Sequence, residues 1–242
     1  MDIQFADDIT QLVKYPGKSR EMLARKTERE IKNINQYEQD WKIQTNRNKF
    51  KILMASRLKG GNITIDNEII EYSNKINILG LQISRTGIGL HIKERIGRAR
   101  EAFNKIKRFG DLTVNIKLHL YKALIRSIIE YPMVPMCTMS RTNMLKVQSF
   151  QNKCLKYITA TDHQNANLTN EEIHIKYQID PFNIRLWKSG QKVWRKLEVH
   201  NPELTRQSME LNEENTRDHY WWNRIGKYVA NSEPQPIYGR TE

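Results

Sequence analysis

Residues 1–13 read MDIQFADDITQLV. Short apolar runs flank the adjacent carboxylates Asp7 and Asp8, and Ile3 and Phe5 alternate with polar neighbours as in a β-strand. Alternation on both sides of a polar pair predicts a β-hairpin with the two aspartates at its tip. Mg²⁺ suits this position, because it binds one or two carboxylates together with nucleotide phosphates. The alternative at this stage is a plain polar turn.

The charge of the chain is strongly basic and unevenly distributed. Its 242 residues carry a formal net charge of +13, with a pI near 9.7. Residues 14–60 and residues 85–126 each contribute a net charge of +8, whereas residues 201–242 are mildly acidic. Basic segments of this kind favour a polyanionic partner, most often nucleic acid. A solvated basic face is the alternative.

Several classes of protein are disfavoured by the sequence. No apolar run approaches the roughly 20 residues of a membrane span, and the acidic N-terminus is unlike a signal peptide. Cys137 and Cys154 lie on apolar, helix-like stretches, so buried free thiols are expected rather than a disulfide framework. The six histidines show no metal-ligand spacing. We therefore expect an intracellular protein of the nucleus, the cytoplasm or both, neither secreted nor bound to a membrane.

The first third of the chain predicts short strands around one long helix. Ser19 is a good cap for an amphipathic helix that reaches Trp41. After it we expect a strand over residues 49–54 and a hairpin of residues 63–65 and 68–72 around Asp66-Asn67. A further strand is expected over residues 75–83, interrupted by Gly80.

From Gly89 onward the periodicity is helical. Residues 92–106 carry a narrow apolar seam, and further helices are expected over residues 118–128 and 144–158. Thr169 opens a capping box, and Asp180 is expected to cap a helix with Pro181 at its first position. The fold class is therefore α+β. We expect an α+β part over residues 1–84, a helical part over 85–200, with the boundary near Thr86-Gly87, and a polar tail over 201–242. In that tail Tyr220-Trp221-Trp222 would either stack on bases or pack against a helix.

The motifs, taken in order, resemble the reverse transcriptase of non-LTR retrotransposons, particularly jockey-like mobile elements. The resemblance covers roughly residues 1–200. It rests on blocks that recur in the family's order: FADD at residues 5–8, the W…N…K block of residues 41–49, LG at 79–80, LYKALIRSIIEY at 120–131, QNK at 151–153 and PFNIRL at 181–186.

The resemblance implies a partial polymerase palm, made of a β-hairpin, a long helix and short antiparallel strands, followed by an all-helical thumb and connection region. Asp7 would be the Mg²⁺ ligand of the catalytic site, with Asp8 as the supporting carboxylate. Lys49 would either contact the phosphates of the incoming nucleotide or brace the hairpin. Leu79 and Gly80 would form the primer grip.

The same resemblance implies that the partners are an RNA template and a DNA primer, paired as a hybrid duplex. The cations of the first long helix after Gly87 would contact the sugar-phosphate backbone of that duplex. They are Lys93, Arg95, Arg98, Arg100, Lys105, Lys107 and Arg108.

The chain also departs from the family. A complete polymerase has fingers and another essential aspartate upstream of FADD, and neither is found in this sequence. We therefore expect an RNA-directed DNA polymerase fragment that is inactive alone. The alternatives are a non-catalytic, basic nucleic-acid-binding remnant and a pseudogene product.

Overall fold

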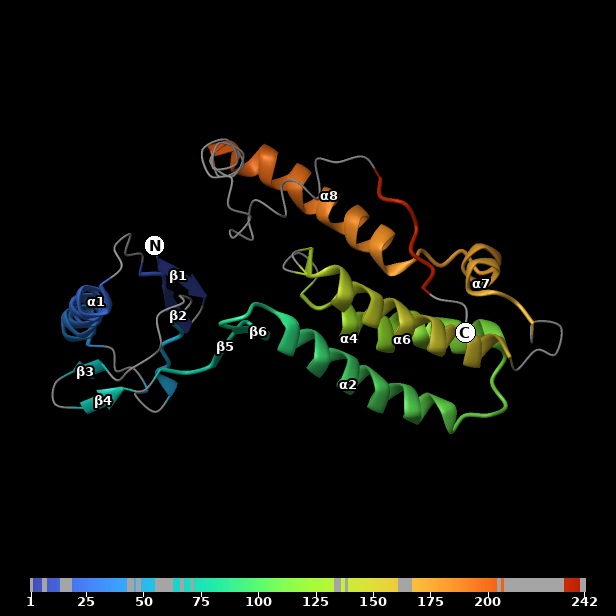
Figure 1. Ribbon diagram of the computed structural model, residues 1–242, viewed down its shortest axis with the longest axis horizontal. Coiled ribbons are helices and arrows are strands. Elements are labelled where there is room, and N and C mark those ends of the chain that lie inside the picture. Colours follow the sequence, from blue (N-terminus) through green and yellow to red (C-terminus); the bar gives the residue numbers. More distant parts are fainter. Residues whose placement is uncertain are drawn as a thin grey trace. The chain divides into compact units, whose positions relative to one another are not determined.

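The N-terminal stretch forms the expected hairpin. In the computed structural model β1 (Asp2–Phe5) pairs antiparallel with β2 (Asp8–Gln11), with Phe5 opposite Asp8 (Figure 1). The sequence between the paired ends is two residues long, which is the usual length of a tight hairpin connection. The prediction of a hairpin at FADD is therefore confirmed, whereas Asp8, expected at its tip, is the first paired residue of β2.

The structure describes residues 2–5, 8–13, 19–42, 46, 49–54, 63–65, 68–70, 72–132, 136–137, 139–160, 167–203, 206 and 233–239. The chain divides into two compact units, Met1–Gly87 and Ile88–Glu242. The first contains strands and one long helix and the second contains helices, so the chain mixes helix and antiparallel sheet (Figure 1). Each unit is described by itself below.

The long helix α1 (Arg20–Trp41) begins and ends on local signals. The backbone N–H of Met22 donates to the Ser19 Oγ at 3.3 Å, which satisfies one of the unpaired donors of the first turn. Lys42 ends the helix with a left-handed backbone, at φ 52°. Both bounds agree with the prediction.

A small core joins α1 to the second hairpin. β3 (Ile63–Ile65) pairs with β4 (Glu68–Ile70) as predicted. Ile31 of α1 and Ile63 of β3 are buried together, and the partly buried residues around them are Ala24, Phe50, Ile52, Ile70 and Tyr72.

Two strand predictions in this unit need correction. Of residues 49–54 only Ile52 pairs, through an isolated bridge with Tyr72. The expected strand over 75–83 is a third hairpin, β5 (Lys75–Ile78) with β6 (Leu81–Ser84). Its turn is Leu79-Gly80, with φ values of 48° and 78°. Positive φ at both central residues is typical of the type I′ turn, which matches the twist of paired strands.

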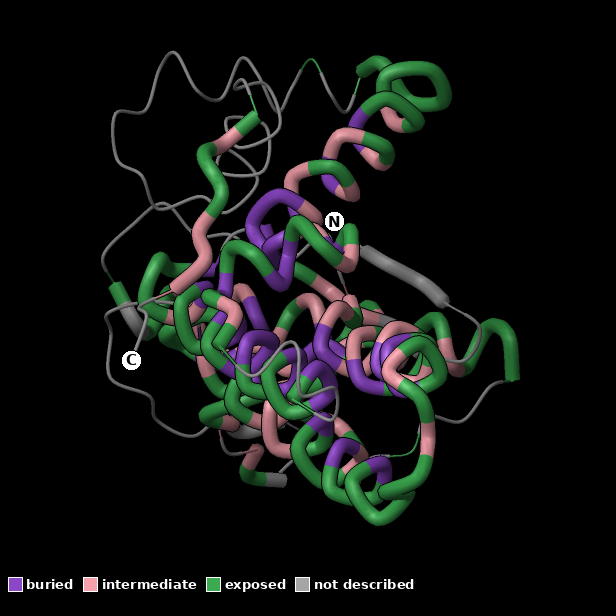
Figure 2. Tube along the Cα trace, turned by 90° about the vertical axis from the view of Figure 1, so that its right-hand side faces the viewer, coloured by how far each residue is buried: buried purple, intermediate pink, exposed green. Residues whose placement is uncertain are grey.

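The helical unit is built around α6. Its helices are α2 (Gly89–Lys107), α3 (Val114–Leu120), the π-turn η2 (Tyr121–Ile125), α4 (Arg126–Glu130), α6 (Arg141–Thr159), α7 (Asn170–Lys176) and α8 (Phe182–His200). α6 contacts α2, α3, α7 and α8, so it lies at the centre of the unit. Buried positions recur along one side of each long helix, and the opposite sides are exposed (Figure 2).

The apolar seam predicted on α2 is the buried face of that helix. Ile92, Ala99, Phe103 and Ile106 are buried, and Ile96 is partly buried against the same core. The next predicted helix is longer than expected and is formed by α3, η2 and α4 in succession. Lys117 of α3 is buried and donates from Nζ to the carbonyl of Gly110 at 2.9 Å, so one cation of the basic segment is directed inward.

The caps of the later helices follow the sequence with one exception. The Thr169–Glu172 capping box of α7 is present in both directions. At α8 the N-cap is Pro181 rather than Asp180, so that prediction is wrong by one residue. Asp180 instead pairs with Lys188, with Oδ2 and Nζ 3.1 Å apart. A Pro side chain cannot accept a hydrogen bond, so the N-cap residue gives no side-chain cap. The side-chain oxygen of Gln148 accepts from the Phe182 N–H instead.

Both cysteines are free and buried, as predicted. Burial raises the pKa of Cys137 and of Cys154 to about 12, because the thiolate would lose its hydration. These thiols therefore pack as small apolar groups in the core of the helical unit.

The end of the chain differs from the polar tail expected for residues 201–242. Residues 233–239, the red segment in Figure 1, return to the helical unit, where Ile237 packs against the core. Hydrogen bonds from Asn152 and Asn183 hold the backbone of this segment. Tyr220-Trp221-Trp222 lies outside the described residues.

Candidate nucleic-acid interface

Of the two predicted metal ligands, the structure describes only the backbone of Asp8. Asp8 is the first residue of β2 and stands opposite Phe5, whereas Asp7 and the side chain of Asp8 lie outside the described part of the chain. Among the described residues no group of three or more His, Cys, Asp or Glu could hold a metal ion. Because Asp7 is not among these residues, the Mg²⁺ site stays a prediction.

The other predicted palm residues are in turns. Lys49 is exposed, and its backbone N–H donates to the Asn46 carbonyl at 3.0 Å. Leu79 forms the tip of the β5–β6 hairpin with Gly80, and it is 43 % exposed at φ 48°. A positive φ costs a bulky residue roughly 1–2 kcal/mol. A strained, exposed leucine is the kind of backbone outlier that accumulates at functional sites.

The seven predicted cations of the helix α2 have different surroundings. Arg95 is half-buried with its guanidinium carbon 5.0 Å from the centre of the Tyr131 ring, and burial lowers its pKa. Arg98 pairs with Glu94, with Nη2 and Oε1 2.5 Å apart. Lys107 Nζ lies 4.9 Å from the centre of the Tyr157 ring. The other four are exposed, namely Lys93, Arg100, Lys105 and Arg108.

These cations form two rows on α2. Residues seven apart are about two turns apart and lie on one face. Lys93, Arg100 and Lys107 form one such row, on the side of α2 that faces α6, because Lys107 lies over Tyr157 of that helix. Arg98 and Lys105 form the other row, and each follows a glutamate by four residues. The first row has no acidic residue three or four positions away on α2.

The helix α6 runs beside α2 in the same direction. A Cβ on Gly89, at the start of α2, would lie 3.5 Å from Asn143 Nδ2 near the start of α6. At the other ends, the Tyr157 hydroxyl donates to the Lys107 carbonyl at 3.4 Å. The two helices therefore share a long seam.

Cations of α6 border the same seam. This helix has four basic residues and no acidic residue. Lys153 lies one turn before Tyr157 and Lys146 lies two turns before Lys153, and both are exposed. We call the five residues along this line the basic seam; they are Lys93, Arg100, Lys107, Lys146 and Lys153.

Sequence reasoning found the α2 half of the basic seam and missed the α6 half. Lys146 and Lys153 lie beyond the segment of highest net charge, which ends at Arg126. The seven-residue spacing in a helix without acidic residues would have indicated them. Which cations of α2 face α6, however, depends on tertiary packing.

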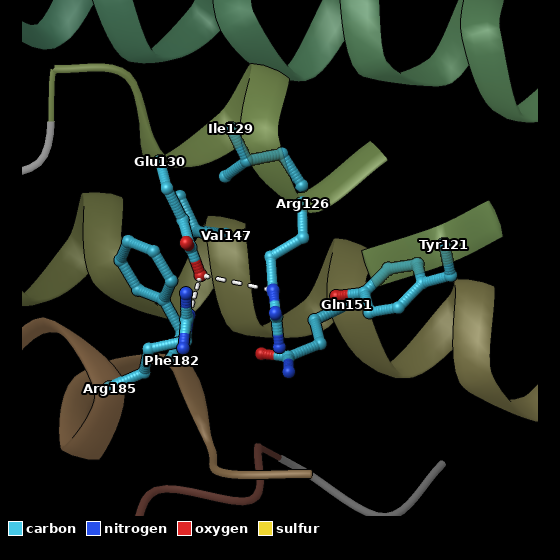
Figure 3. A pocket seen from close by; sticks show the side chains of 8 residues that line it. All are labelled: Tyr121, Arg126, Ile129, Glu130, Val147, Gln151, Phe182 and Arg185. Carbon is cyan, nitrogen blue, oxygen red and sulfur yellow. Dashed lines mark hydrogen bonds and ion pairs between the residues drawn. The ribbon is translucent and has the colours of Figure 1, made fainter. Parts of the chain in front are cut away.

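A second charged cluster is structural in character. Glu130 of α4 lies between Arg126 and Arg185 of α8, and it pairs with both (Figure 3). The bond to Glu130 raises the pKa of Arg185. The cavity beside them measures about 10 Å³, which is space for about one water molecule. The cluster therefore joins α4 to α8 and is too small for a substrate.

Comparison with known proteins gives no identification: no family model, no curated protein and no solved structure matches this chain. None of the helices that the structure describes is both long and apolar enough to span a membrane.

Proposed function

We propose that this chain is the C-terminal part of a non-LTR retrotransposon reverse transcriptase, and that its helical unit binds the sugar-phosphate backbone of a template–primer duplex. The basic seam is the observation that carries the proposal. It places five exposed cations along two parallel helices, and the two acidic residues of α2, Glu94 and Glu101, belong to the other row. Phosphate contacts of this kind supply most of the sequence-independent affinity for nucleic acid.

The segregation of charge favours a binding face over a solubility device. A solubility device needs only interspersed charges of both signs, as in the row of Arg98 and Lys105, which follow Glu94 and Glu101. Glu94 pairs with Arg98 and Glu101 lies four residues before Lys105, so the basic seam is the more positive side of α2. The seam contains no base-reading motif, so binding through phosphates with little sequence preference is expected.

In this proposal the first unit supplies the end of the palm. Asp8 begins β2 and directly follows Asp7 in the sequence, and carboxylate oxygens are the ligands that Mg²⁺ prefers. The ion would offset negative charge on the phosphates of the nucleotide. Leu79 and Gly80 at the tip of the β5–β6 hairpin would contact the primer end.

Salt dependence of binding to a DNA duplex and to an RNA–DNA hybrid tests the proposal. The triple variant Lys93→Ala, Arg100→Ala, Lys153→Ala removes three cations of the basic seam. We expect the slope of log affinity against log salt on B-form DNA to become shallower by up to about 2.7, at roughly 0.9 per lost phosphate contact.

The matched control removes three exposed cations away from the seam, through Arg98→Ala, Lys105→Ala and Lys156→Ala. It lowers the net charge equally and should leave the slope close to that of the unchanged chain. Equal slopes for the two triple variants would mean that only net charge matters, and the basic seam would then not be a specific face.

Primer extension on an RNA template separates the enzyme from the alternative, a non-catalytic nucleic-acid-binding remnant. Extension with Mg²⁺ that Asp7→Asn abolishes would identify a working polymerase site. Seam-dependent binding without extension is the result expected of this chain alone, and it would leave nucleic-acid binding as its activity, as in the remnant. If the chain neither binds nucleic acid nor extends a primer, the remaining alternative is a pseudogene product.

A further inference from the structure

Residues 233–239 are held by side-chain amides of the helical unit. Asn183 of α8 donates from Nδ2 to the Gln235 carbonyl at 2.7 Å and accepts from the Ile237 N–H at 3.1 Å. One amide thus binds an acceptor and a donor two residues apart, as a neighbouring strand would. Asn152 of α6 donates from Nδ2 to the Tyr238 carbonyl at 2.5 Å.

The amides are fixed in advance by a buried network. Gln148 donates from Nε2 to Asn152 Oδ1 at 2.8 Å, and its own oxygen accepts from the Phe182 N–H at 2.7 Å. Because Oδ1 of Asn152 is bound in this way, its Nδ2 is directed at the segment. Asn152 and Asn183 are 7 % and 2 % exposed. Buried donors such as these need an acceptor, since an unpaired one is costly.

Three residues of the segment make contacts that depend on their side chains or on glycine. Ile237 packs against the core of the helical unit, and the Tyr238 ring lies 5.6 Å from the His174 ring of α7. Gly239 has φ +76°, and a Cβ there would lie only 2.9 Å from Asn152 Nδ2. Glycine is therefore required at this position by both its backbone and its close approach.

The flanking prolines suit an extended ligand. Pro234 and Pro236 have no N–H and favour an extended backbone. In this segment the N–H of Ile237 donates to Asn183, and position 236 donates no hydrogen bond to the helical unit. A proline at 236 is therefore compatible with the contacts of the segment. The segment PQPIYG thus has the features of a recognised peptide.

Residues 201–232 separate this peptide from α8, so no short covalent connection holds it in place. We propose that α6, α7 and α8 form a peptide-binding groove and that residues 234–239 of this chain are its detachable ligand. The groove reads an extended backbone through Asn152 and Asn183, and it selects Ile-Tyr-Gly. This inference does not depend on nucleic-acid binding.

The test uses the full chain with a site-specific protease sequence inserted between residues 201 and 232. The folded protein is cut, and the released C-terminal piece is exchanged for a fluorescent peptide of residues 232–239. Fluorescence anisotropy then measures binding of this peptide and of its Gly239→Ala version. We expect saturable binding, weaker by roughly tenfold for Gly239→Ala, because alanine is strained at a positive φ.

Asn183→Asp in the cut protein tests the other side of the contact, in the groove instead of in the peptide. It keeps the shape of the side chain and removes the donor to Gln235, so the unchanged peptide should also bind more weakly. Three results would overturn the proposal. They are no binding while circular dichroism shows intact helices, equal binding of both peptides, and loss of helices on cutting, which would make the segment an integral part of the fold.

Discussion

His174 is a buried histidine at the centre of a hydrogen-bond network. Its Nδ1 lies 2.6 Å from the Ile179 carbonyl, which can only accept, so Nδ1 carries a proton. Its Nε2 lies between a donor and an acceptor, 3.2 Å from Gln148 Nε2 and 3.1 Å from Asn152 Oδ1. Burial favours the neutral form and lowers the pKa of His174, with only partial opposition from its bond to Ile179 and from Asp180.

The lowered pKa predicts a loss of stability in mild acid. In the unfolded chain a histidine titrates near 6.5, so below that pH the unfolded state binds more protons than the folded state. The free energy of unfolding should be at its plateau above about pH 6.5 and fall as the pH decreases further. His91, whose pKa burial also lowers, acts in the same direction.

Urea midpoints at pH 7.5 and pH 5.0 measure this effect. In His174→Gln the difference between the two midpoints should be smaller than in the unchanged chain, because one of the two buried histidines that the structure describes is gone. An identical difference in both proteins would show that His174 is not the group that titrates.

At the scale of elements, Gly97 is a weak position in α2. It lies in the middle of the helix, and a Cβ there would meet nothing within 4 Å. Glycine in a helix interior is destabilising by roughly 0.5–1 kcal/mol relative to alanine. Gly97→Ala should therefore raise the free energy of unfolding of the helical unit by about that amount, as measured by urea denaturation.

Gly87→Ala is the contrasting change. A Cβ at Gly87 also has open space, but its φ is +98°, a backbone conformation that alanine adopts only with strain. This variant should be destabilised. If both substitutions stabilise the protein, backbone conformation does not govern the effect and the interpretation of Gly97 is wrong.

The elements predicted correctly are those defined within a few residues. Ser19 and the Thr169–Glu172 box cap their helices through atoms three positions away, so a local pattern suffices. The turn at Leu79-Gly80 was missed because leucine is disfavoured at a positive φ, and the apolar run around it resembles one strand. In the candidate site, the sequence identified the cations of α2. The sequence could not show which of these cations face α6, such as Lys93, and which lie away from it, such as Arg98, because that depends on how the two helices pack.

At the scale of the whole molecule, the least predictable contacts join residues far apart in the sequence. Asn183 holds Gln235 across 52 positions, and the composition of PQPIYG does not show which residues of the helical unit it meets. Asn152 and Asn183 lie in the QNK and PFNIRL motifs, but the motifs do not indicate this contact, because buried asparagines acquire a role only from the backbone that they meet.

The two units have cores of very different size. Among the described residues, the buried apolar cluster of the first unit consists of Ile31 and Ile63, whereas that of the helical unit has 22 members. Each fully buried large apolar side chain contributes roughly 1.5–3 kcal/mol. The first unit should therefore unfold at a lower urea concentration than the helical unit.

Circular dichroism and thiol labelling together separate these events. Both cysteines of the chain are buried in the helical unit, so they report only on its unfolding, and their raised pKa values make them unreactive while folded. Loss of α1 and the hairpins should reduce the dichroism at a urea concentration where Cys137 and Cys154 still resist labelling. The thiols should react only in a second step at higher urea. A single transition in which dichroism and labelling change together would mean that the two units unfold cooperatively, and the difference in core size would then not determine the order.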